Sequence, residues 1–278
     1  MIIKNCLEDC LAAHDECAHS APHFTSDVPH EVRFLEVKYQ GVLLVEGMTP
    51  DRYACLSHCW GSRQDIYKTK IENLRAHCMV WIAKSQIPRT IQDSIDICQR
   101  FKIKYLWIDS LCIIQDSDED WNKQASMMAD VYENAWITIA ASHSQNPTEG
   151  CFTHNDTYKY WPLFKRAWAF QELSISPRVI HFGPREVIWH CLFNRSEHLQ
   201  RYWHDMVWRY SRAGLTFHKD RLPAIAALTS RVRDMKTNDR YLSGLWEFSI
   251  CHDLIWYSVL RPNSMAGEPI TSAEKRAT

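Results

Sequence analysis

The sequence predicts an α/β fold with a doubly wound, mostly parallel sheet. Short apolar segments with β-branched residues alternate with helix-like segments from Tyr53 to Ala141. Two of these apolar segments end in polar residues, as expected where a ligand binds beyond the carboxyl ends of parallel strands. Helices that join parallel strands imply right-handed crossovers, so we expect helices on both faces of the sheet.

A hairpin, a strand and a helix are predicted first. Arg33–Lys38 and Val42–Glu46 flank the turn residues Gln40-Gly41 and predict a hairpin. Tyr53–Ser57 is predicted as the next strand. Lys70–Ile82 is predicted as a helix, although its amphipathic pattern is loose.

The clearest helix is predicted over residues 87–101. Its apolar residues recur at helical spacing and should face the sheet: Ile91, Ile95, Cys98 and Phe101. Thr90 and Asp93 resemble a capping box at its start. A strand at Tyr105–Ile108 follows, and the next helix begins at Ser117.

The rest of the chain predicts one more core strand, an added hairpin and C-terminal helices. The strand is Trp136–Ala141, and a short helix at 166–176 precedes the hairpin formed by 178–183 and 186–191. The later helices are predicted at 197–211, 221–234 and 241–258. The predicted domains are an N-terminal helix and linker (1–30), the main domain (31–195), a helical extension (196–260) and a disordered tail (261–278).

Composition excludes several classes of protein. The 278 residues include 32 basic and 33 acidic ones, a formal net charge of -1, so nucleic-acid binding is not expected. No uninterrupted apolar run approaches about 18 residues, and the acidic amino terminus is unlike a secretory signal. We therefore expect a cytoplasmic protein without a membrane span, with its 11 cysteines reduced.

The N-terminal segment has the densest group of potential metal ligands: Cys6, Cys10, His14, Cys17 and His19. Spacings of four place the first three of these on one helix face. Zinc binding is one interpretation of this pattern. No CxxC pair recurs, however, and Leu7 and Leu11 run beside that face, so a buried amphipathic helix is preferred and no metal site is predicted.

Two predicted strands are followed by side chains that can do chemistry. They are Ser57, His58 and Trp60 after the first strand and Asp109, Ser110 and Cys112 after the second. Because ligands bind beyond the carboxyl ends of parallel strands, one shared site is expected there. The alternative is that each group only caps its strand.

Five segments together resemble the HET domain, the heterokaryon incompatibility domain of filamentous fungi. They are LEDCLAAHDEC, YACLSHCWG, the run from IPRTIQ to WITIAAS, RAWAFQELSISPRVIHFG and IWHC, and they cover about residues 5 to 195 in the expected order. The resemblance implies a role in programmed cell death after fusion of genetically unlike hyphae. It also implies a fold similar to the TIR domain, a flavodoxin-like unit, and an incompatibility partner or self-association.

Some TIR domains cleave NAD with a glutamate, so the resemblance implies NAD as a substrate and requires no cofactor. By that analogy Glu172 is the first candidate catalytic residue, and Asp109 is the second. Groups that could bind the nucleotide are Arg166 on pyrophosphate, Trp60 and Trp168 stacking on a ring, and Gln171 as a hydrogen-bond donor. Arg166 could instead form a structural ion pair with Glu172.

Other functions are also consistent with the sequence. A thiol mechanism would use Cys112 as nucleophile, His58 as base and Asp109 as the orienting acid. A non-catalytic signalling module would assemble through exposed helices. The short 153–162 loop and the early end at Thr278 are expected of a degenerate, truncated copy. A small-molecule biosynthetic enzyme is a further alternative.

Overall fold

The structure of the protein is a computed structural model in which two compact units are distinguished, Met1–Thr237 and Asn238–Thr278. The residues that it describes are 2–14, 17, 32–61, 67–153, 161–184, 186–191, 203–214, 220, 222–235, 239–242 and 245–247. The predicted linker before residue 31 and the predicted tail at 261–278 lie outside these residues.

The first unit contains one eight-stranded sheet in the order β4-β2-β1-β5-β3-β6-β7-β8. Its strands are β1 (Phe34–Lys38), β2 (Gly41–Val45), β3 (Tyr53–Ser57), β4 (Ile82–Ala83), β5 (Tyr105–Trp107), β6 (Ile137–Ala140), β7 (Arg178–Phe182) and β8 (Val187–Cys191). The four central strands β5, β3, β6 and β7 are parallel. In chain order they run 2-1-3-4, as in the first four strands of a flavodoxin-like sheet.

The expectation of a mostly parallel sheet is wrong, because antiparallel strands flank the parallel centre on both sides. The pairs β1–β2 and β7–β8 are hairpins, whose short connections allow only antiparallel pairing. β1 also pairs antiparallel with β5, and β2 with β4. The sheet is therefore mixed, although both predicted hairpins and the α/β class are confirmed.

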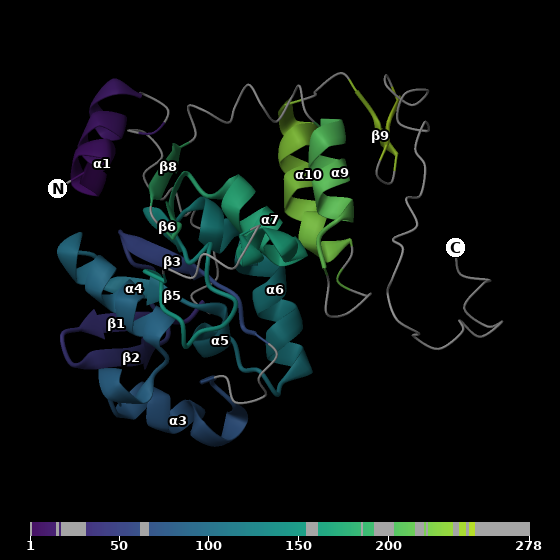
Figure 1. The fold of residues 1–278 in the computed structure, drawn as a ribbon. Coiled ribbons are helices and arrows are strands. Elements are labelled where there is room, and N and C mark those ends of the chain that lie inside the picture. Colours follow the sequence, from purple (N-terminus) through teal and green to yellow (C-terminus); the bar gives the residue numbers. More distant parts are fainter. Residues whose placement is uncertain are drawn as a thin grey trace, which may run out of the picture. The chain divides into compact units, whose positions relative to one another are not determined.

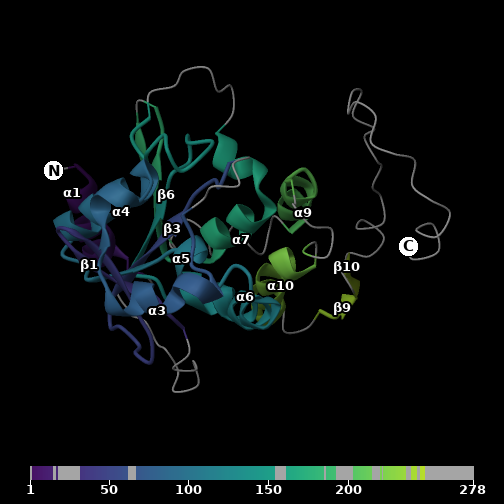
Figure 2. The same ribbon diagram turned by 90° about the horizontal axis from the view of Figure 1, so that it is seen from below.

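Helices cover both faces of this sheet. The helices described in this unit are α1 (Ile2–Ala13), α3 (Ile71–Met79), α4 (Arg89–Arg100), α5 (Asp109–Cys112), α6 (Asp118–Glu133), α7 (Ala167–Ile175), α9 (Trp203–Ser211) and α10 (Pro223–Met235). Figure 1 gives their order along the chain, and Figure 2 shows α4 on one side of β3 and β6 with α6 and α7 on the other. α9 and α10 both pack on α7, through Tyr210 and Ala224 against Ala167.

Local signals predicted the start of α6 and the buried face of α4. The Ser117 hydroxyl accepts a hydrogen bond from the backbone N–H of Asp120, as an N-cap does. On α4, Ile91, Ile95 and Cys98 are at most 1 % exposed, as expected of the face against the sheet.

The predicted capping box of α4 is wrong. The Thr90 hydroxyl accepts a hydrogen bond from the backbone N–H of Gly150, and an Asp93 carboxylate oxygen accepts one from that of Cys151. Both side chains therefore hold a distant loop and do not close the first turn. Gly150 has a φ of 86°, and an added Cβ would lie 2.6 Å from Asp93, so only glycine fits there.

Two predicted helices differ from the structure. α3 ends at Met79, because Val80 is extended and Ile82 pairs with Val42 in the sheet. In the second unit, the expected helix at 241–258 is replaced, over its described part, by the antiparallel strands β9 (Tyr241–Leu242) and β10 (Leu245–Trp246). No helix among the described residues is long and apolar enough to cross a bilayer.

Candidate active site

Strand alternation directs Ser57 toward the face covered by α6 and α7. Tyr53 and Cys55, at the preceding odd positions of β3, both approach the carbonyl oxygen of Val131 in α6, at 2.6 and 3.7 Å. Because alternate residues of a strand share one face, Ser57 faces the same way at the carboxyl end. β3 and β6 are adjacent there, at the point where the strand order reverses.

The inner part of the site is a hydrogen-bonded group of Ser57, Tyr132 and Glu172. The Ser57 hydroxyl donates to Oε2 of Glu172 at 2.5 Å. The Tyr132 hydroxyl lies 3.1 Å from the same oxygen and 3.2 Å from the carbonyl oxygen of Leu56. Its single proton serves one acceptor at a time, so Tyr132 donates to Glu172 when that carboxylate is charged and can turn to Leu56 when it is not.

The outer part of the site is built around Asp109, the first residue of α5. The indole N–H of Trp60 donates to both carboxylate oxygens of Asp109, at 3.2 and 3.0 Å. The backbone N–H of Ser110 donates to Oδ1 at 2.7 Å. β3 and β5 are adjacent and parallel, so the two predicted strand ends do meet at one edge of the sheet.

Gly61 fixes the turn that carries Trp60 away from β3. It has a φ of 73°, and an added Cβ would lie 2.7 Å from the side chain of Asn146. A residue with a side chain would be strained in that backbone conformation and would also clash. The position of the Trp60 indole over Asp109 therefore depends on this glycine.

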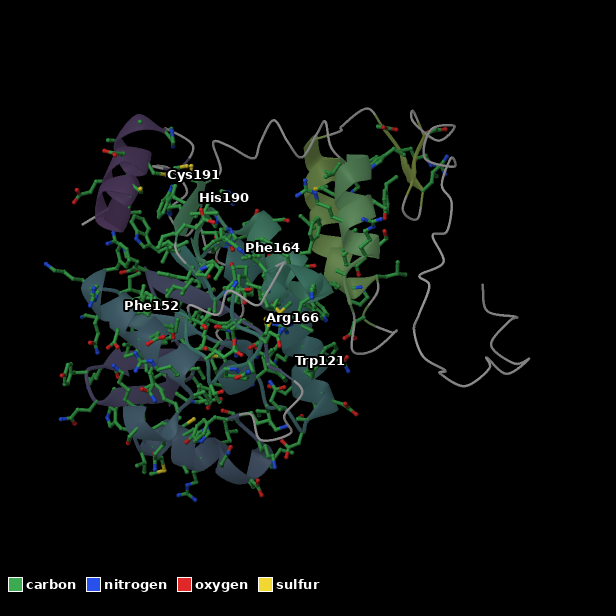
Figure 3. All side chains as sticks on the ribbon, in the orientation of Figure 1. Trp121, Phe152, Phe164, Arg166, His190 and Cys191 are labelled. Carbon is green, nitrogen blue, oxygen red and sulfur yellow. The ribbon has the colours of Figure 1, made fainter. Side chains whose placement is uncertain are left out.

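Arg166 supplies the positive charge near both carboxyl groups. It lies directly before α7 (Figure 3) and is half-buried. It donates a hydrogen bond to the carbonyl oxygen of His58. Burial lowers the pKa of Arg166, but Glu172 and Asp109 outweigh this effect and raise it overall. No ion pair joins Arg166 directly to either carboxylate among the described residues, so the guanidinium is anchored by a carbonyl and keeps donors for a ligand.

Both carboxyl groups are shifted toward their neutral forms. Burial raises the pKa of Glu172, while Arg166 and the hydroxyls of Ser57 and Tyr132 oppose the rise. Burial also raises the pKa of Asp109, again against Arg166. Ionisable groups with pKa values shifted in this way are typical of acid–base and electrostatic catalysis.

The imidazole ring of His58 is buried without hydrogen bonds. It is 1 % exposed, and neither ring nitrogen has a hydrogen-bond partner. Burial and the nearby Arg166 lower the pKa of His58 to about 3, so the ring is neutral at ordinary pH. Two unsatisfied ring nitrogens beside Arg166 are costly to the fold, and a ligand that bonded to them would relieve that cost.

Cys112 lacks the surroundings of a nucleophile. Burial raises the pKa of this thiol to about 12, and its sulfur accepts a hydrogen bond from the backbone N–H of Ile108 at 3.4 Å. The side chain is fully buried, and no hydrogen bond links it to His58. An inert core thiol is the better interpretation.

The side chains of three other predicted ligand residues make no hydrogen bond to the site residues described above. Trp168 donates to Asp220 at 3.3 Å and packs edge-on against Trp121. The Gln171 amide faces the carbonyl oxygens of Pro223 and Ala224, at 3.2 and 3.0 Å in the orientation that lets it donate to both, so it ties α7 to α10. Ser110 is fully buried, and its hydroxyl has no partner.

Sequence reasoning missed the role of Tyr132. Its place in the apolar stripe of α6 predicts only core packing, and the ring does pack edge-on against the buried Trp107 at 5.4 Å. The sequence does contain a signal for this role, because a tyrosine on a buried helix face needs a hydrogen-bond partner for its hydroxyl inside the protein.

Part of the chain is similar to known proteins. Residues 53–161 match the family described as heterokaryon incompatibility protein (HET). The protein named heterokaryon incompatibility protein 6, OR allele, of Neurospora crassa is 30% identical over 110 residues, which cover 34% of this chain and 15% of that relative. The chain thus matches only a small part of that relative's length.

No solved structure matches the chain. The matched segment nevertheless contains the end of β3, all of α5 and the Tyr132 end of α6, which together supply most of the site. Residues 53–161, which are less than half of the chain, are therefore similar to the HET domain of the heterokaryon incompatibility family.

Proposed function

We propose that the chain acts in the cytoplasm in fungal nonself recognition and programmed cell death, through a TIR-like HET domain that cleaves the nicotinamide bond of NAD. The observation that carries the proposal is Glu172, a 2 % exposed carboxyl group bonded to Ser57 and Tyr132 near Arg166. The parallel strand order also supports it, because this cluster lies where the order reverses.

The chemistry needs few groups. Nicotinamide leaves the ribose as a neutral molecule, so the main requirement is to stabilise the oxocarbenium-like sugar cation. A carboxylate held in a site that excludes water stabilises this cation well, because its negative charge is already in position when the cation forms. We assign this role to Glu172, with the Ser57 and Tyr132 hydroxyls holding the carboxylate in place.

The outer groups would bind the rest of the nucleotide. Arg166 has the charge to bind pyrophosphate, and the half-buried Trp60 offers a ring face. The nitrogens of His58 could bond to a ribose hydroxyl. Because Trp60, Asp109 and Arg166 are the half-buried members, we expect the ligand to enter past them.

The test is nicotinamide release from NAD by the purified chain and two variants. Glu172→Gln keeps the shape and removes the charge, so the rate should fall about 100-fold or more. Glu119→Gln makes the same change at an exposed position of α6 and should keep the wild-type rate. Equal rates in all three folded proteins would remove Glu172 from the mechanism.

A non-catalytic signalling module is the second candidate. The burial of the inner part of the site favours this function, since Ser57, Tyr132 and Glu172 are at most 2 % exposed. Its partner would be an incompatibility protein or a second copy of the chain. Absence of NAD turnover in folded protein, together with assembly that rises with concentration in sedimentation, would support this function instead.

A further inference from the structure

Three cysteines and one histidine meet beside the outermost strand of the sheet. They are Cys10 in α1, His14 and Cys17 just after it, and Cys191 at the end of β8. Their four candidate ligand atoms all lie within 4.8 Å of one another. Figure 3 shows Cys191 on β8 next to the N-terminal helix.

The spacing of the first three residues follows the helix period. The backbone N–H of His14 donates to the carbonyl oxygen of Cys10 at 3.1 Å, and that of Cys17 donates to His14 at 3.0 Å. The turn geometry therefore continues past the end of α1. Residues at positions 10, 14 and 17 then share one helix face, because four and three residues each make about one turn.

One distance within the cluster matches that in a tetrahedral metal site, and the other ligand atoms are close by. Zinc binds thiolate sulfur at about 2.3 Å and imidazole nitrogen at about 2.0–2.1 Å, so a tetrahedron places sulfur and nitrogen about 3.5 Å apart and two sulfurs about 3.8 Å apart. The sulfur of Cys191 lies 3.5 Å from Nδ1 of His14. A hydrogen bond alone would explain this pair, but not the convergence of two further thiols on it.

The charge around the cluster also suits zinc. A Zn²⁺ ion with three thiolates and a neutral imidazole carries one net negative charge. Arg178 is fully buried nearby and donates to the carbonyl oxygen of Cys17 at 2.8 Å. It also donates to the carbonyl oxygen of Trp136 and lies over the ring of Trp136, so a guanidinium is fixed beside the site to balance that charge.

We propose that Cys10, His14, Cys17 and Cys191 form a structural zinc site that fastens the N-terminal helix to strand β8. The set of four ligands is closed, with no position left for substrate, as in structural rather than catalytic zinc sites. This proposal differs from the sequence-based expectation of no metal. Cys6 is not part of the cluster, and His19 lies outside the described residues.

Attachment of α1 to β8 would also protect an edge of the sheet. β8 is an edge strand, and edge strands left open tend to pair with other chains. α1 contacts β8, and three of the four ligands are buried there with Trp189. A metal ion that joins residues 10 to 17 with residue 191 holds this cover in place.

The experiment measures the metal content of purified chain by mass spectrometry, after expression with zinc available. The wild type should carry one zinc per chain. Cys191→Ser should lose it, Cys191→His should retain it, and Cys6→Ser, in the same helix but outside the cluster, should match the wild type. Cobalt added to chelator-stripped wild type should give the visible bands of a tetrahedral thiolate site.

A second readout protects the test against a variant that does not fold. Removal of zinc from the wild type by a chelator should lower the melting temperature, and added zinc should restore it. The proposal would be overturned if the folded wild type contained no zinc and did not bind added cobalt. A disulfide among the three cysteines under reducing conditions, or iron or copper in place of zinc, would also overturn it.

Discussion

Ser57 and Glu172 are 115 positions apart in the sequence, yet the Ser57 hydroxyl donates a 2.5 Å hydrogen bond to the Glu172 carboxylate. The bond joins the end of β3 to the middle of α7, and both side chains are buried. It is the contact that brings an acid from α7 to the polar end of β3.

Ser57→Ala should destabilise the fold by about 1–3 kcal/mol, because it leaves a buried carboxylate oxygen with Tyr132 as its remaining hydroxyl partner. Urea unfolding of the variant and the wild type measures this difference. The matched change Ser126→Ala removes a hydroxyl whose hydrogen bond is exposed, and it should alter stability much less. Equal losses in both variants would show that burial of the bond does not matter.

Glu172→Gln should make the chain more stable at neutral pH. Burial raises the native pKa of Glu172 above its usual value, so its favourable contribution is complete below about pH 4.5 and is lost as the pH rises through the native pKa. The glutamine variant stays neutral and avoids that loss. Melting curves from about pH 4 to 8 should therefore diverge as the pH rises, and curves that stay parallel would contradict the assigned shift.

His58 should make the fold sensitive to acid. Its pKa is lowered from 6.5 to about 3, so stability is complete above pH 6.5 and falls as the pH drops toward 3. Between about pH 6.5 and 5 the loss should be on the order of 2 kcal/mol. His58→Leu should reduce the dependence of the free energy of unfolding on pH, and it removes no side-chain hydrogen bond. His190→Leu, at an exposed position, should leave that pH dependence unchanged.

Arg33→Met should cost about 3 kcal/mol or more, because it leaves Asp120 without its ion-pair partner in a largely buried place. Arg33 also donates to the carbonyl oxygen of Cys112 at 2.9 Å, so it supports the segment that carries Asp109. Chemical denaturation gives the value. Lys70→Met breaks the exposed pair with Glu72 and should cost less than about 1 kcal/mol; a similar cost for both would contradict the argument.

The sequence predicts elements whose signals are local. The strand Tyr53–Ser57, the turn at Gly41 and the buried face of α4 each follow from residue spacing over a few positions. The antiparallel pairing of β1 with β5 does not, because strand pairing is decided by packing between segments that are distant in the sequence.

The candidate site shows the same division. Ser57 and Asp109 could be selected as chemical groups after predicted strands, and Glu172 through the resemblance to TIR domains. The direction of a short, mostly buried helix, however, is not visible in its pattern. Gln171 and Trp168 therefore turned out to contact α10 and Asp220. The fourth member of the Cys10 cluster, Cys191, is likewise supplied by a strand far along the chain.

The stretch that matches the family ends at residue 161, five positions before Arg166 and eleven before Glu172. A fragment cut at the limits of that match would keep Ser57 and Tyr132 but remove the acid that both of them touch. It would also lose β1 and β7, so β5 and β6 would become edge strands with unpaired backbone groups. We expect a fragment with these boundaries to aggregate through the exposed edges and to lack the proposed activity.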